Sequence, residues 1–164
     1  MAQESAQHAG LVLGLRDVAE AAGFAVTALD QAGWRRPPLL RGYRPDLTAR
    51  HLAVRNWLIG EAKLGPDLRD QRTLEQFWAF SHVLVAASRP VYARFILAVP
   101  AGWTGAAWRA LAESGARLGN TAVIGEATGQ WSITWHPRPA AGSWPGSAPG
   151  TPPQSLPCGG HYSP

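Results

Sequence analysis

Cysteine is almost absent from this sequence of 164 residues, since only Cys158 occurs, near the C-terminal end. A single thiol excludes an internal disulfide framework and a zinc site built from several cysteines. No apolar run approaches the roughly 18 residues that a membrane helix needs. The N-terminal residues lack the basic start and small-residue cleavage site of a signal peptide. We therefore expect a cytoplasmic protein with no membrane segment.

Lysine is equally scarce. Of the 15 basic residues, 14 are arginine, and the only lysine is Lys63. A coding bias toward GC-rich codons would explain the excess of arginine, but it would not explain where the one lysine stands.

Positive charge is concentrated in one stretch of this mildly basic chain, whose formal net charge is +4. Six arginines fall between residues 35 and 55, where the only acidic residue is Asp46: Arg35, Arg36, Arg41, Arg44, Arg50 and Arg55. Such a cluster can neutralise nucleic-acid phosphates. It can equally be a solvated arginine-rich face, and the cluster alone does not decide between the two.

The hydrophobic pattern predicts one α/β domain over residues 1–136. Helices are expected at residues 7–22, 68–87 and 104–118, the last capped by Thr104 and ended by Gly119. Strands are expected at residues 24–29, 43–50, 56–63, 93–99, 121–126 and 130–135, with a hairpin turn at Thr128-Gly129. Helices would flank a central mixed sheet of four or five strands.

The composition changes after His136. Residues 137–164 contain 8 of the 14 prolines, five glycines and one formal charge, Arg138. Such a segment cannot bury an apolar core, so we expect a disordered C-terminal tail.

Three residues stand in an arrangement that suits phosphate chemistry: Asp46, Glu61 and Lys63. Glu61 and Lys63 are two apart in a predicted strand, so they point to the same face. Asp46 and Glu61 are equidistant from the midpoint of residues 53 and 54, so an antiparallel hairpin centred there places the two carboxylates opposite or diagonal to each other. Paired carboxylates are tolerable when a divalent cation lies between them, and a neighbouring ammonium can stabilise charge on a phosphate.

Each part of this pattern is common, and another interpretation exists. Asp46 would cap a turn after Pro45, while Glu61 and Lys63 would form a surface ion pair. The combination favours the metal site, because an apolar strand leads into Glu61 and the only lysine occupies the last position.

The segment from Tyr43 to Lys63 resembles the core of the PD-(D/E)xK nuclease superfamily, which includes restriction endonucleases and Holliday-junction resolvases. The resemblance is close over residues 43–63 and loose over residues 8–100. It implies a restriction endonuclease-like αβββαβ core in which Asp46 and Glu61 bind Mg²⁺, with Mn²⁺ as an alternative, and Lys63 is the catalytic lysine. Gln76 matches a glutamine that many members carry on the following helix.

The sequence departs from the family on the first helix, where some members have a further acid. Glu4, Asp17 and Glu20 are present there, but none is placed convincingly. The five histidines are scattered without the i, i+4 spacing of a helical metal site, so we expect them to be structural or surface residues.

These observations predict a Mg²⁺-dependent endodeoxyribonuclease with Asp46, Glu61, Lys63 and Gln76 at the catalytic site. Arg35, Arg36, Arg41 and Arg44 are the expected DNA contacts. A catalytically weak or inactive module of the same fold, which binds DNA or a partner protein, is the alternative. An unrelated α/β fold with a fortuitous motif is a third. The sequence leaves open whether the chain acts as a homodimer or with a partner subunit.

Overall fold

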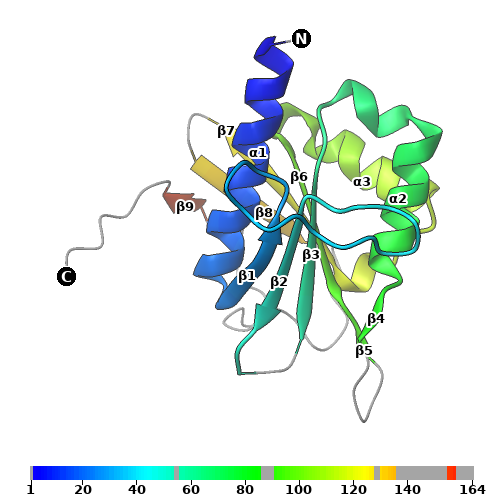
Figure 1. The fold of residues 1–164 in the computed structure, drawn as a ribbon. Coiled ribbons are helices and arrows are strands. Elements are labelled where there is room, and N and C mark those ends of the chain that lie inside the picture. The colour runs from blue at the N-terminus through cyan, green and yellow to red at the C-terminus, as the bar shows by residue number, and fades with distance from the viewer. Residues whose placement is uncertain (1, 54–55, 86–90, 128–129, 136–154, 158–164) are drawn as a thin grey trace.

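The chain forms a mixed α/β structure with a curled mixed sheet (Figure 1). The computed structural model describes residues 2–53, 56–85, 91–127, 130–135 and 155–157. Within these residues the helices are α1 (Ala2–Ala21), α2 (Gln71–Ser81) and α3 (Thr104–Glu113), with single 3₁₀ turns η1 (Pro66–Arg69), η2 (Ala101–Trp103) and η3 (Leu118–Asn120). None of the helices in this described part is long and apolar enough to cross a membrane.

The main sheet has seven strands. In spatial order they are β1 (Phe24–Leu29), β2 (Leu47–His51), β3 (Trp57–Ala62), β6 (Arg94–Pro100), β7 (Thr121–Ala127), β8 (Gln130–Trp135) and β9 (Ser155–Pro157). The β3–β6 and β6–β7 pairs are parallel, and the other four neighbouring pairs are antiparallel. Two short strands, β4 (Leu84–Val85) and β5 (Val91–Tyr92), pair with each other outside this sheet.

Helices cover both faces of the sheet (Figure 1). On one face α1 packs with Leu11, Leu15 and Val18 against β2, β3 and β6. On the other face α2 and α3 pack over a cluster that includes Phe77, Phe80, Phe95 and Leu111. The central strand β6 is therefore buried from Phe95 to Val99, as expected for a parallel strand covered on both sides.

The predicted pairing of the second and third strands is confirmed. Leu47 lies opposite Gly60, which is the register centred between residues 53 and 54. The second strand starts four residues later than expected, at Leu47. Pro45 has no backbone N–H to donate, and Tyr43 instead forms an isolated bridge with Leu40.

The first helix begins at Ala2, five residues earlier than predicted, and the predicted C-terminal ends of the other two helices are wrong. The helix expected at residues 68–87 is divided by the extended residue Asp70, and α2 ends at Ser81, after which β-branched Val83 and Val85 favour strand. The last helix ends at Glu113 rather than at residue 118, because Gly115 takes the left-handed conformation (φ +71°) predicted for Gly119.

Thr104 is not the cap of that last helix. It is the first residue of α3, and its hydroxyl donates to the Ala101 carbonyl. The residue in the N-cap position is Trp103, which makes no side-chain capping hydrogen bond.

The sheet is larger than predicted, with seven strands in place of four or five. One of them, β9, comes from the segment expected to be a disordered tail and pairs with β8 from Gln130 to Ser132. The rest of that tail, residues 137–154 and 158–164, and the predicted turn at 128–129 lie outside the described residues.

The contact between α1 and β8 depends on a glycine. A Cβ atom built on Gly14 would lie 1.7 Å from Trp131 Cζ2, and Trp131 is buried. No heavy atom lies within 4 Å of the Cβ position of Gly10, one helical turn earlier. The two glycines are therefore a matched pair.

We expect Gly14→Ala to lower the free energy of unfolding by about 1–3 kcal/mol, because the methyl group overpacks the interface. Gly10→Ala is expected to raise it by up to about 1 kcal/mol, from helix propensity alone. Urea denaturation of both variants measures the difference. Equal stability of the two would contradict the packing of Trp131 on Gly14.

Candidate functional site

Asp46 is held at the end of β3 by backbone and side-chain hydrogen bonds. Its N–H donates to the Gly60 carbonyl (3.0 Å), and its own carbonyl accepts from the Asp30 N–H (2.7 Å). The carboxylate oxygen Oδ2 accepts a hydrogen bond from the Ala62 N–H at 2.8 Å. Asp46 thus reaches across the strand pair to β3, and it does not cap a local turn after Pro45.

Glu61 lies on the face of β3 that α2 and α3 cover, because its neighbour two residues back, Ile59, belongs to the core cluster on that face. It is only 2% exposed. Lys63 Nζ donates to Glu61 Oε1 at 2.7 Å. The ion pair considered above is therefore present, but it is buried and does not lie at the surface.

The second oxygen of Glu61 has no hydrogen-bond partner within the part of the chain that the structure describes. Oε2 is buried and accepts no hydrogen bond from the described residues. A buried carboxylate oxygen without a donor is costly, because nothing replaces the water that it loses on folding. A carboxylate oxygen in this position is free to bind a metal ion.

Burial raises the pKa of Glu61 to about 8, and the negative charge of Asp46 adds to the rise. The positive charge of Lys63 and its hydrogen bond act in the opposite direction but are outweighed. Near neutral pH, in the absence of a cation, the Glu61 carboxyl is therefore largely protonated.

The first helix contributes His8 to this site. Its Nε2 atom lies 3.6 Å from Asp46 Oδ2, and the interaction with that carboxylate raises the pKa of His8 against the opposing effect of burial. Within the described residues, His8 is therefore the one histidine placed beside the predicted site residues, and the expectation that the histidines are structural or surface residues stays a prediction here. His8 stands three residues before Leu11 and four before Val12, both buried, and that spacing marks it as lying on the inward side of the helix.

Gln76 is on the buried side of α2, and α2 packs on the same sheet face as Glu61. It is therefore not the plain solvent-facing helix residue that was its alternative. None of the hydrogen bonds among the described residues joins it to Asp46, Glu61 or Lys63, so its part in the site stays a prediction.

The four arginines expected to contact DNA differ in their surroundings. Arg35 and Arg36 are exposed, and Arg36 Nε lies 3.6 Å from Asp30 Oδ1. Arg44 is half-buried and donates to the Pro37 carbonyl. Arg41 is exposed, but its guanidinium lies over the Trp78 ring and donates to the His82 carbonyl. Arg44 and Arg41 therefore also hold the segment between β1 and β2 in place.

A divalent cation fits the donor set of two carboxylates. No group of three or more His, Cys, Asp and Glu side chains arranged to hold a metal occurs in the described part of the chain. Mg²⁺, however, is commonly bound by one or two carboxylates, with water and substrate phosphate completing its shell. The orphaned Glu61 oxygen beside Asp46 matches that requirement.

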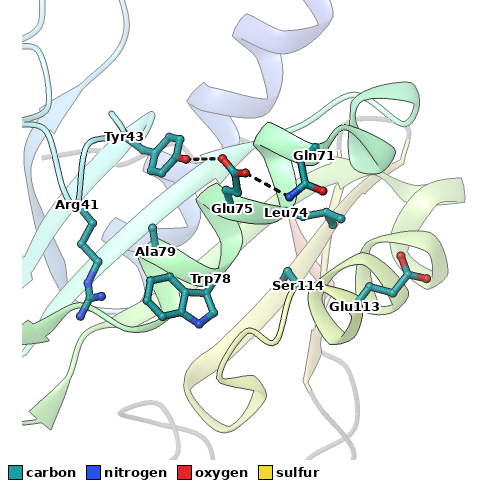
Figure 2. A pocket seen from close by; sticks show the side chains of 9 residues that line it. All are labelled: Arg41, Tyr43, Gln71, Leu74, Glu75, Trp78, Ala79, Glu113 and Ser114. Atoms are coloured by element: carbon teal, nitrogen blue, oxygen red, sulfur yellow. Dashed lines mark hydrogen bonds between the residues drawn. The ribbon is translucent and has the colours of Figure 1, made fainter.

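A separate cavity of about 450 Å³ lies against the outer side of α2 (Figure 2). Tyr43 and Glu75 meet at its edge, where the Tyr43 hydroxyl donates to Glu75 Oε2 at 2.6 Å. Asp46, Glu61 and Lys63 do not line it. The cavity is therefore distinct from the carboxylate site.

Comparison with protein-family models, curated proteins and solved structures finds no significant match to this chain. The site must therefore be interpreted from its own geometry.

The raised pKa of Glu61 makes stability depend on pH. The folded protein holds the Glu61 proton up to about pH 8, whereas the unfolded chain releases it near pH 4.5. The unfolded state thus binds fewer protons in this window, and the free energy of unfolding falls as the pH rises through it. His8, whose pKa is also raised, adds a decline in the same direction.

We expect Glu61→Gln, which mimics the protonated side chain, to be more stable than the wild type by about 1–3 kcal/mol at pH 8.5 and to differ little at pH 4.5. Thermal and urea denaturation across this range measures the difference between the two proteins and so removes the contribution of His8. A difference that does not change with pH would show that Glu61 titrates normally.

Proposed function

We propose that the chain is a metal-dependent DNA endonuclease that hydrolyses phosphodiester bonds at a site formed by Asp46, Glu61 and Lys63. The observation that carries this proposal is the buried Glu61 carboxyl. It pairs with the only lysine, its pKa is raised partly by the charge of Asp46, and one of its oxygens has no hydrogen-bond partner among the described residues. Burial of this carboxyl group costs free energy that its ion pair with Lys63 does not fully offset. A function that requires a cation there explains why this arrangement exists.

Each residue has a distinct role in this proposal. Asp46 and Glu61 would hold Mg²⁺ or Mn²⁺, and such an ion polarises the phosphate and lowers the pKa of bound water. Lys63 would place its ammonium group beside the phosphate, where it stabilises developing negative charge. Arginine would be a poor substitute, because the site accommodates a compact point charge. His8 would hold Asp46 in orientation from α1.

The order of elements supports the finer assignment of the fold. Along the chain α1 is followed by β1, β2 and β3, then by α2 and β6, with only the short β4–β5 pair inserted. This order corresponds to the αβββαβ core that the resemblance to PD-(D/E)xK nucleases implies. Asp46 then lies directly before the second strand of that core, and Glu61 lies near the end of the third strand.

A catalytically inactive module of the same fold, which binds DNA or a protein, is the second candidate. Two features favour it: Glu61 is only 2% exposed, and Arg44 is occupied with the Pro37 carbonyl. In such a module the carboxylate pair would be a remnant that no longer binds a metal.

We expect the purified protein to cleave DNA in the presence of Mn²⁺ or Mg²⁺. Incubation with plasmid, linear and branched DNA tests this, with Lys63→Ala as the inactive variant and EDTA as the metal-free control. Loss of the lysine charge is expected to reduce the rate about 100-fold or more. Equal cleavage by the wild type and Lys63→Ala would point to a contaminating nuclease and would count against the proposal.

Metal binding is tested separately by isothermal titration calorimetry. We expect Mn²⁺ to bind the wild type more tightly at pH 8.5 than at pH 6.5, because Glu61 must lose its proton before it can act as a ligand. Asp46→Ala and Glu61→Gln should abolish this binding. Glu20→Gln is the matched control, since Glu20 is exposed near the C-terminal end of α1.

If Glu20→Gln weakens binding as much as Glu61→Gln does, the ion is held by diffuse negative charge and not by the pair of acids. If the wild type binds no metal at all, the inactive module becomes the better description.

A further inference from the structure

A row of three aromatic rings with an arginine at each end lies outside the carboxylate site. We call it the arginine-aromatic row; its members, in order of contact, are Arg41, Trp78, His82, Tyr92 and Arg117. They come from four separate segments: the loop before β2, the C-terminal part of α2, β5, and the loop after α3. The fold therefore assembles this row, and no single stretch of sequence contains it.

Each member touches the next through a ring face or edge. The Arg41 guanidinium lies 5.1 Å from the centroid of the Trp78 ring. The Trp78 and His82 rings stack with centroids 4.9 Å apart, and His82 meets Tyr92 edge-on at 6.1 Å. At the far end the Arg117 guanidinium lies 3.7 Å from the centroid of Tyr92.

The row is accessible and largely uncommitted to the core. Both arginines are exposed, and Trp78 is 44% exposed. Arg41 gives one donor to the His82 carbonyl, and the described residues provide no ion pair for either guanidinium. Exposed tryptophan is energetically unfavourable in water, and arginine donors stay hydrated, so both kinds of group gain from a ligand.

The geometry points to a surface that binds single-stranded nucleic acid. Aromatic rings and guanidinium planes stack unpaired bases, and the same guanidinium groups form hydrogen bonds with phosphates. A duplex offers no free base faces, so the row is expected to prefer an unpaired strand. This inference rests on the proposed function only for the identity of the strand as DNA, and it deepens that function by making unpaired or branched DNA the preferred substrate.

The cavity in Figure 2 adjoins the Arg41 end of the row and limits how a strand can lie there. Arg41 and Trp78 line it, together with the carboxylates of Glu75 and Glu113. Those carboxylates repel phosphate but accept hydrogen bonds from the amino groups of bases. We therefore expect a base at the cavity and the phosphates nearer the other end, at Arg117.

Part of the row lies along one side of α2. Gln71, Glu75, Trp78 and His82 recur at helical spacing, so they share the outer side of the helix, opposite the buried Phe77 and Phe80. A strand bound along this side would be held apart from Asp46 and Glu61. Binding and cleavage can accordingly be measured as independent properties.

The test is fluorescence anisotropy with a labelled single-stranded oligonucleotide of mixed sequence and the same oligonucleotide annealed to its complement, both in EDTA to prevent cleavage. The full chain is used as the wild type, Trp78→Leu, Tyr92→Leu and Arg117→Gln. Arg109→Gln is the matched control, because it removes one exposed charge from α3 outside the row. Thermal melting verifies that each variant is folded.

We expect the wild type to bind the single strand more tightly than the duplex. Trp78→Leu and Tyr92→Leu should each weaken single-strand binding about tenfold. Arg117→Gln should reduce the slope of log K against log salt by about 0.7, the value for one phosphate contact on a single strand, while Arg109→Gln leaves the slope unchanged.

Three outcomes would overturn the inference: tighter binding of the duplex, unchanged affinity in the two aromatic variants, or an equal loss in Arg117→Gln and Arg109→Gln. A polyglutamate peptide is tested in parallel. If it binds in a manner that depends on Tyr92 while the oligonucleotide does not bind, the row belongs to an acidic protein partner and the inference is wrong. Single-strand binding without Mn²⁺-dependent cleavage would support this inference and count against the nuclease. Mn²⁺-dependent cleavage together with unchanged single-strand affinity of Trp78→Leu and Tyr92→Leu would support the nuclease and overturn this inference.

Discussion

The desolvation of one carboxyl group is the constraint on which the electrostatics of the carboxylate site depends. Glu61 lies within the sheet, beside Asp46 and Lys63, and burial outweighs the attraction of the lysine, so its pKa rises to about 8. A protein that needed only a stable strand at this position would place an apolar residue there, as it does at Ile59. The cost of Glu61 is most simply offset by a cation that satisfies both carboxylates at once.

The fold explains how Asp46, Glu61 and Lys63 are held close to one another. Antiparallel pairing of β2 with β3 brings Asp46 to the end of the strand that carries Glu61, and the Ala62 N–H fixes the Asp46 carboxylate there. β3 pairs in parallel with β6 along its other edge, so it is an interior strand of the sheet. The Lys63 N–H extends this pairing by donating to the Ala98 carbonyl. Helix α1 then closes the site by adding His8.

The hairpin register was predictable from the sequence, because Asp46 and Glu61 are symmetric about one point and strand side chains alternate. The depth of Glu61 was not, since it depends on β6, α2 and α3, which the local pattern does not place. His8 carries a usable signal in its spacing from Leu11 and Val12, but a search for the i, i+4 histidine pairs of a metal site does not detect it. The predicted end of α3 is wrong for a local reason. Two glycines, Gly115 and Gly119, can each terminate the helix, and the first of them takes the left-handed conformation. The arginine-aromatic row joins four segments and could not be foreseen from any one of them.

The two proposals give different tasks to different parts of one domain, with phosphodiester hydrolysis at the end of β3 and strand recognition along α2. Only the first of these proposed tasks requires a divalent ion, because a domain without the ion would still bind a strand. The most direct measurement is anomalous diffraction from crystals of the protein soaked in Mn²⁺ above pH 8. The account predicts an anomalous peak within coordination distance of carboxylate oxygens of both Asp46 and Glu61. Density that shows Glu61 still paired with Lys63 and no peak beside it would contradict the account.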